Sequence, residues 1–174
     1  HAGSVTGLQL AIGSSAMSNS IAEMEHLEAF IVTGSNTTET HPVISNFLKR
    51  AVRQNGAKLV VIDPRKIEMT DFATLWLRQR PGTDVAVWQA MAHVVVKERL
   101  YNQDFINQRT EGFSDYVESL EDFTPEWAEE ISGVPAEDIR AAARIYATAG
   151  SAAVYWGMGI SQSTHGTDNT LAIT

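Results

Sequence analysis

The amino-acid sequence predicts an α/β domain in which a mainly parallel sheet is flanked by helices. Short apolar runs alternate along the chain with amphipathic stretches of helical spacing. The runs 30–32, 59–62 and 152–156 each end directly in a short polar loop. Parallel strands bring their carboxyl ends to one edge of a sheet, where open α/β folds bind ligands. We therefore expect any binding site to lie among these loops.

Local patterns predict the elements of the first half of the chain. Short helices are expected at 4–13 and 17–26, followed by a first strand at 28–33. A helix at 42–55 begins with a proline, which suits the first helical position, and its apolar residues share one stripe. The run 58–62 is almost continuously apolar, as expected for a strand that helices cover on both faces.

The second half continues the alternation of strands and helices. A third strand is expected at 72–77, a long helix at 84–99, and a final strand at 152–156 after a helix that Pro135 opens. The segment 102–133 is more acidic and aromatic, and we interpret it as a peripheral helical cover. The expected architecture is a Rossmann-like, three-layer domain.

Composition limits the classes of function. A chain of 174 residues with 44% apolar residues is long enough for one domain, and we expect residues 1–174 to form one. The net charge of −8 argues against a nucleic-acid partner or an anionic membrane. Without cysteine, this segment supplies no disulfide and no iron-sulfur ligand. No apolar stretch approaches the length of a membrane span, so the sequence predicts a soluble chain.

Three polar loops are candidate ligand sites. Asp63-Pro64-Arg65-Lys66 offers a carboxylate for a ribose and cations for a phosphate just after a strand, although a solvated turn is an equal alternative. The loop 34–40 could hold a phosphate on its backbone amides, or it could be an ordinary capped connection. Gly157-Met158-Gly159 begins like a dinucleotide fingerprint, but Gln162 replaces the third glycine, which counts against NAD.

Metal ligation by this chain is not expected, because its histidines have none of the spacings that metal sites use. Two alternative functions remain open on residues alone. One is the central domain of a thiamine-diphosphate enzyme, which also places an apolar strand and a glycine-rich loop after an alanine-rich helix. The other is a non-catalytic α/β interaction domain whose polar loops bind nothing.

Taken together, the loops resemble those of the molybdopterin oxidoreductases, and within them the alpha (catalytic) subunits of formate dehydrogenases. The spacing between Asp63-Pro64-Arg65 and Pro81-Gly82-Thr83-Asp84 is the most specific part of the resemblance. The stretches that carry it are 13–19, 34–42, 55–66, 80–84, 110–113, and 156–159 with Gln162.

The resemblance implies that an α/β domain holds part of a molybdopterin guanine dinucleotide along its strand ends. Asp63 or Asp84 would accept hydrogen bonds, and Arg65 or Arg80 would contact phosphate. Glu39 and Thr40 replace the Asp-Ser pair that formate dehydrogenases often carry, but keep an acid and a hydroxyl. The implied cofactor-binding residues are Gly34, Asn36, Glu39, Thr40, Ile62, Asp63, Arg65, Arg80, Gly82, Asp84, Gly157, Met158, Gly159 and Gln162.

The resemblance also implies the activity of a larger parent protein, of which this chain is a fragment. In that parent, formate is oxidised to carbon dioxide by a cofactor that holds molybdenum or tungsten, and electrons pass through an iron-sulfur cluster outside this segment to electron-transfer subunits. His1 corresponds to the catalytic histidine that follows the metal-bound cysteine or selenocysteine. The parent is expected in the cytoplasm, with a periplasmic location left open, and the isolated fragment is expected to be inactive.

Overall fold

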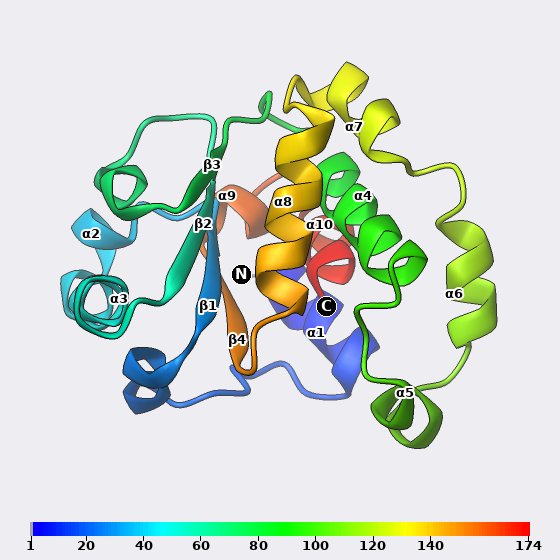
Figure 1. Ribbon diagram of the computed structural model, residues 1–174, viewed down its shortest axis with the longest axis horizontal. Coiled ribbons are helices and arrows are strands. Elements are labelled where there is room, and N and C mark those ends of the chain that lie inside the picture. Colours follow the sequence, from blue (N-terminus) through cyan, green and yellow to red (C-terminus); the bar gives the residue numbers. More distant parts are fainter. Residues whose placement is uncertain (1) are drawn as a thin grey trace.

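A computed structural model describes residues 2–174 and contains a four-stranded parallel sheet in the order β3-β2-β1-β4 (Figure 1). Every neighbouring pair of strands is parallel, so the prediction of a parallel α/β sheet is confirmed. Three of the strands begin and end within one residue of the predicted bounds. The strands are β1 (Ala29–Thr33), β2 (Lys58–Ile62), β3 (Leu75–Leu77) and β4 (Ala152–Trp156).

One face of the sheet is covered by α3 and the short elements around it. Alternate strand residues point to this side, so that Phe30, Val32, Leu59 and Val61 are completely buried against Leu48 of α3. Helix α3 ends where Gly56 takes a left-handed conformation, as its sequence predicts. The elements on this face are η1 (Ile21–His26), α2 (Thr37–Thr40), α3 (Pro42–Asn55) and η2 (Glu68–Phe72).

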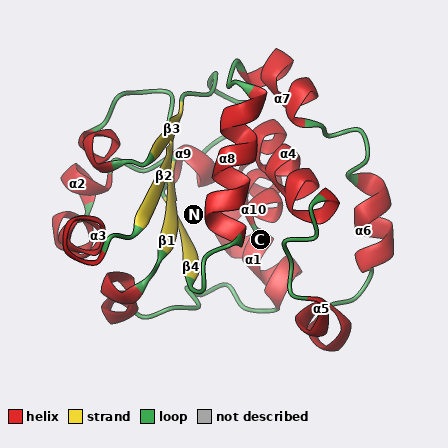
Figure 2. Cartoon of the chain, viewed as in Figure 1, coloured by secondary structure: helices red, strands yellow, loops and turns green. Residues whose placement is uncertain are grey.

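The other face packs against a thicker layer of helices, which gives the molecule three layers (Figure 2). Ile31, Val60 and Ile62 point to this side and contact a core that includes Val87 and Ile139. The helices of this layer are α4 (Asp84–Lys97), α7 (Pro125–Ser132) and α8 (Ala136–Ala147), while α5 (Gln103–Arg109) and α6 (Phe113–Ser119) lie farther out beside α4 (Figure 1).

The two ends of the described chain meet in a helical pair. Helix α1 (Ala2–Ile12) packs along α10 (Gly166–Ile173), close to the short helix α9 (Met158–Ser161) that follows β4. Glycines make this approach possible, since a Cβ at Gly7 would stand 2.6 Å from the Cβ of Thr170. None of the helices within residues 2–174 has the length and apolar character that a bilayer crossing requires.

Two predicted elements differ from the structure. The strand expected at 72–77 is wrong in its first three residues, because the chain winds as a 3-10 turn over Glu68–Phe72 and buries Met69 completely. Only then does Thr74 meet β2, where its amide donates to the carbonyl of Leu59 and its hydroxyl accepts from the Leu59 amide. The helix expected at 17–26 begins only at Ile21, after Ser20, whose hydroxyl donates to Glu23.

Candidate functional site

The carboxyl edge of the sheet carries a cavity of about 740 Å³. It is surrounded by the loops that follow all four strands, and one wall comes from the start of α1. This is the edge at which the sequence places the candidate site. The lining residues are Ser4, Gly34, Ser35, Asn36, Thr40, His41, Asp63, Pro64, Arg65, Gln79, Pro81, Gly82, Asp84, Trp156, Gly157, Met158, Gly159 and Ser161.

Glycines bring the loops after β1 and β4 into backbone contact beside the cavity. The amide of Gly159 donates to the carbonyl of Gly34 at 2.9 Å, and Gly34 has a φ of +53°. A Cβ at Gly159 would stand 2.7 Å from the Cα of Gly34, and one at Gly157 would stand 2.9 Å from the Gly34 carbonyl oxygen. These loops therefore touch only because no side chains separate them.

The loop after β2 forms a tight turn around a buried carboxylate. Asp63 is only 6% exposed, and its Oδ1 accepts a hydrogen bond from the backbone amide of Arg65 at 2.8 Å. This hydrogen bond between a side chain and the backbone two residues later stabilises the turn, which explains why an aspartate precedes Pro64. The side chain of Arg65 is exposed, and within residues 2–174 it forms no ion pair. A cation is therefore available at the cavity wall.

Gln79 and Asp84 form a second buried polar group in the cavity wall. Gln79 is 3% exposed and Asp84 is 8% exposed, and the Gln79 Nε2 donates to Asp84 Oδ1 at 2.9 Å. Burial raises the pKa of the Asp84 carboxyl, the charge of Asp63 raises it further, and the hydrogen bond from Gln79 opposes the shift. Neither Asp63 nor Asp84 pairs with a basic side chain of residues 2–174.

Most of the residues that the sequence associates with a cofactor meet at this cavity. Gly34, Asn36, Thr40, Asp63, Arg65, Gly82, Asp84, Gly157, Met158 and Gly159 all line it. Glu39 is exposed on α2 and does not line the cavity, and Gln162 belongs to a different surface hollow beside α10. Ile62 is completely buried, and only its carbonyl reaches the site region, where it accepts from the Gly34 amide. His1 lies outside the described residues.

Arg80 does not line the cavity, and its guanidinium contacts the end of α7. The Arg80 Nη1 donates to the carbonyls of Glu130 and Ile131 at 2.9 and 3.0 Å, and the Arg80 amide donates to the carbonyl of Ser132. Carbonyls in the last turn of a helix lack helical partners, and arginine supplies donors for them. Arg80 thus links α7 to the turn at Pro81-Gly82, and this turn lines the cavity.

Several cavity residues escaped the sequence prediction. Gln79 lies two residues after the buried end of β3, which the sequence placed correctly at residue 77, so the strand-end rule could have found it. Ser4 contributes from the opposite end of the chain, where its hydroxyl accepts a hydrogen bond from the indole nitrogen of Trp156 at 2.9 Å. No local pattern signals a contact between residues 152 positions apart.

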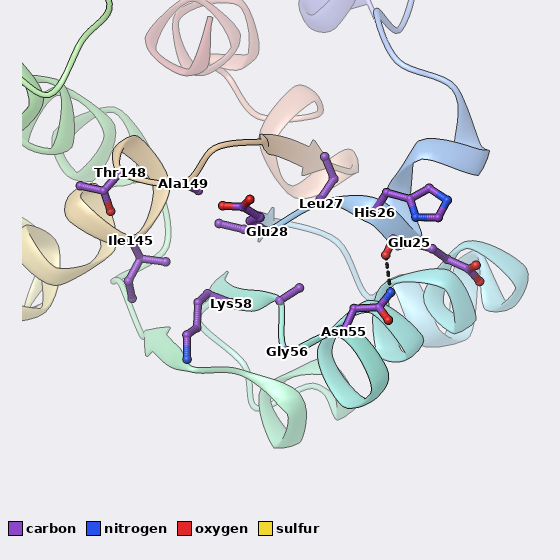
Figure 3. A pocket seen from close by; sticks show the side chains of 12 residues that line it. Glu25, His26, Leu27, Glu28, Asn55, Gly56, Lys58, Ile145, Thr148 and Ala149 are labelled. Carbon is purple, nitrogen blue, oxygen red and sulfur yellow. Dashed lines mark hydrogen bonds between the residues drawn. The ribbon is translucent and has the colours of Figure 1, made fainter.

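A second hollow of about 740 Å³ lies at the opposite edge of the sheet (Figure 3). Polar groups there bond mainly to one another: Asn55 donates to the carbonyl of Glu25, and the carboxylate of Glu28 accepts from the amide of Gly150. Helices α3 and α8 both end at this edge and direct carbonyls toward it. The carboxyl edge, with its buried acids and unpaired arginine, is the better candidate for a ligand site.

Within residues 2–174, no three histidine, aspartate or glutamate side chains gather in an arrangement that could hold a metal ion. The side chains at the cavity are instead suited to an organic ligand, since they combine carboxylates, hydroxyls, an amide and a guanidinium.

Together, the fold and the strand-end cavity define a Rossmann-like α/β domain with a candidate ligand site at its carboxyl edge. The family model for molybdopterin oxidoreductases matches residues 4–174 of the chain. The chain therefore belongs to the molybdopterin oxidoreductase family.

Relatives and a solved structure agree with this assignment. The chain is 43% identical over its whole length to formate dehydrogenase H of Escherichia coli, and 43% identical over 97% of its length to F420-dependent formate dehydrogenase 1 subunit alpha of Methanococcus maripaludis. It spans 24% and 25% of the lengths of these two proteins. The structure of acetylene hydratase from Pelobacter acetylenicus matches this chain with a TM-score of 0.87 and 28% sequence identity. The match covers 98% of this chain and 23% of the acetylene hydratase chain.

Proposed function

We propose that this chain holds the guanosine end of a molybdopterin guanine dinucleotide at the carboxyl edge of its sheet. The observation that carries the proposal is the convergence of separate loops on one cavity. Loops after β1, β2, β3 and β4, which are far apart in the sequence, all line it. A long nucleotide needs contacts of this kind along its length.

The donors and acceptors of the cavity suit the parts of such a nucleotide. The buried carboxylates of Asp63 and Asp84 have no cationic partner among residues 2–174 and are acceptors for the N–H groups of guanine or the hydroxyls of ribose. The exposed guanidinium of Arg65 suits a phosphate. The glycines at 157 and 159 let the loop after β4 pack against Gly34, which brings the loops after β1 and β4 together at the cavity.

We further propose that the parent polypeptide oxidises formate to carbon dioxide, releasing two electrons and a proton. Its formate dehydrogenase relatives support this reaction, and the chain would supply binding and orientation for the cofactor. When bound, the pterin and its molybdenum or tungsten supply the redox chemistry. Other domains of the same polypeptide would hold the metal ligand and an iron-sulfur cluster, and partner subunits would receive the electrons in the cytoplasm. Alone, the chain would have no formate dehydrogenase activity.

Replacing Arg65 by alanine in the full-length polypeptide is expected to lower its pterin content about tenfold, because a charge-assisted phosphate contact is lost. Pterin fluorescence after oxidative release, per mole of purified polypeptide, measures this content. Arg109→Ala is the matched control, since Arg109 is exposed on α5 and does not line the cavity. Unchanged content in Arg65→Ala would contradict a phosphate contact from Arg65, and would be expected if the cavity did not hold the cofactor.

A further inference from the structure

We propose that Gln79 is a positioning residue of the cavity, whose side-chain amide orients the Asp84 carboxylate toward the hydrogen-bond donors of a bound guanosine. The inference rests on the proposed function and assigns a role to a residue for which the sequence pattern gave none. It stands on the short hydrogen bond from Gln79 Nε2 to Asp84 Oδ1 and on the burial of both side chains in one wall.

The hydrogen bond leaves the two oxygens of Asp84 unequal. Oδ1 accepts from Gln79, the backbone amide of Asp84 also donates to the carboxylate, and within residues 2–174 no other side chain does. A carboxylate offers about four acceptor sites on its two oxygens, so these hydrogen bonds leave room for a donor from a ligand. A buried carboxylate without a cation is costly, which makes a ligand N–H or O–H a natural further partner.

The side-chain oxygen of Gln79 provides a second, independent observation that points to a ligand. Its Oε1 is buried and has no hydrogen-bond partner within residues 2–174, although more than nine-tenths of the side chain is buried. Buried amide oxygens are nearly always satisfied in folded proteins. A structural glutamine serving only to pack the wall would not need to bury an unpaired acceptor beside a carboxylate.

The arrangement also links ligand binding to protonation. The titratable groups that line this cavity with Asp84 are His41, Asp63 and Arg65. Without the donor on Gln79, the pKa of Asp84 would rise further above its ordinary value, because only the hydrogen bond from its own backbone amide would then oppose burial and the charge of Asp63. A protonated Asp84 would lose acceptor strength for the ligand.

Guanosine diphosphate binding to the cofactor-free full-length polypeptide, measured by calorimetry from about pH 5 to about pH 8, tests the inference. For Gln79→Leu we expect a Kd about tenfold higher than that of the wild type near neutral pH, with the gap widening as pH falls. For Gln79→Glu we expect the opposite slope, since two adjacent carboxylates share a proton at low pH and repel each other at high pH. His41, Asp63 and Arg65 are common to all variants, so the differences report on position 79.

Gln103→Leu is the matched control, because Gln103 also donates its amide to a side chain but lies on α5, away from the cavity. Replacing guanosine with inosine or 2′-deoxyguanosine diphosphate assigns the free Asp84 oxygen to the base or to the ribose, whichever loses affinity in the wild type. Gln79→Glu keeps the size of the side chain, and its pH slope stands if the leucine variant folds poorly. If both Gln79 variants bound guanosine diphosphate with the affinity and the pH dependence of the wild type, the inference would be overturned. If the wild type did not bind it at all, the proposed function itself would be overturned.

Discussion

Replacing Gly159 with alanine is expected to lower the free energy of unfolding of the chain by about 2 kcal/mol. The new Cβ would stand 2.7 Å from the Cα and 2.8 Å from the carbonyl oxygen of Gly34, and both atoms belong to the backbone. No side-chain rotation can relieve this contact, so the loops after β1 and β4 must separate. Denaturant unfolding followed by circular dichroism measures the change.

Gly150→Ala provides a matched control for this substitution. Neither glycine has a positive φ, and each would acquire the same methyl group. The nearest atom to a Cβ at Gly150 is Oε1 of Glu28 at 3.0 Å, the far end of a flexible side chain that can move away. We expect a cost below about 0.5 kcal/mol there. Equal costs for the two variants would contradict the tight packing between the loops after β1 and β4.

Replacing Asp84 with asparagine is expected to stabilise the chain by about 1 kcal/mol at neutral pH while weakening guanosine binding about tenfold. The amide oxygen of asparagine can still accept from Gln79, so the wall keeps its hydrogen bond. The substitution removes the cost of burying a charge, but it also removes the anionic acceptor. Thermal unfolding and guanosine diphosphate calorimetry on the same variant measure the two effects.

The pH dependence of this stabilisation has a definite sign. Because the pKa of Asp84 is raised in the folded chain, the folded state holds its proton more tightly than the unfolded state does. The free energy of unfolding of the wild type therefore falls as pH rises from the ordinary carboxyl pKa through the raised pKa of Asp84 in the folded state. The Asp84→Asn variant does not lose this stability, because asparagine does not ionise. The advantage of Asp84→Asn should vanish in acid. Asp104→Asn, on the exposed surface of α5, is the matched control for the loss of a carboxylate outside the cavity.

The sequence was sufficient for the elements whose pattern is strong and local. β2 and β4 have the predicted bounds, and α3 begins at its proline and ends before its glycine, because buried strands and amphipathic helices leave periodic signals. The start of β3 was wrong because Phe72, the first residue of the predicted strand, is the last residue of η2. Periodicity cannot distinguish a partly buried turn residue such as Phe72 from a strand residue.

The candidate site was predicted in location more successfully than in its individual contacts. The strand-end rule placed Asn36, Asp63 and Gly157 on one rim, and the structure brings all three to the same cavity. Arg80 was expected at a phosphate, yet the carbonyls at the end of α7 engage it. That contact joins residues 50 positions apart, and no local pattern encodes which of the two arginines lines the cavity.

Hydrogen exchange of the backbone amides, compared between cofactor-loaded and cofactor-free full-length polypeptide, tests the central claim most directly. The account predicts slower exchange with cofactor at 34–36, 63–65, 82–84 and 157–159, where the amides surround the cavity. The opposite edge of the sheet, at 25–28 and 55–58, should exchange at the same rate in both forms. Protection confined to that opposite edge, or no change at the four strand-end loops, would contradict the account.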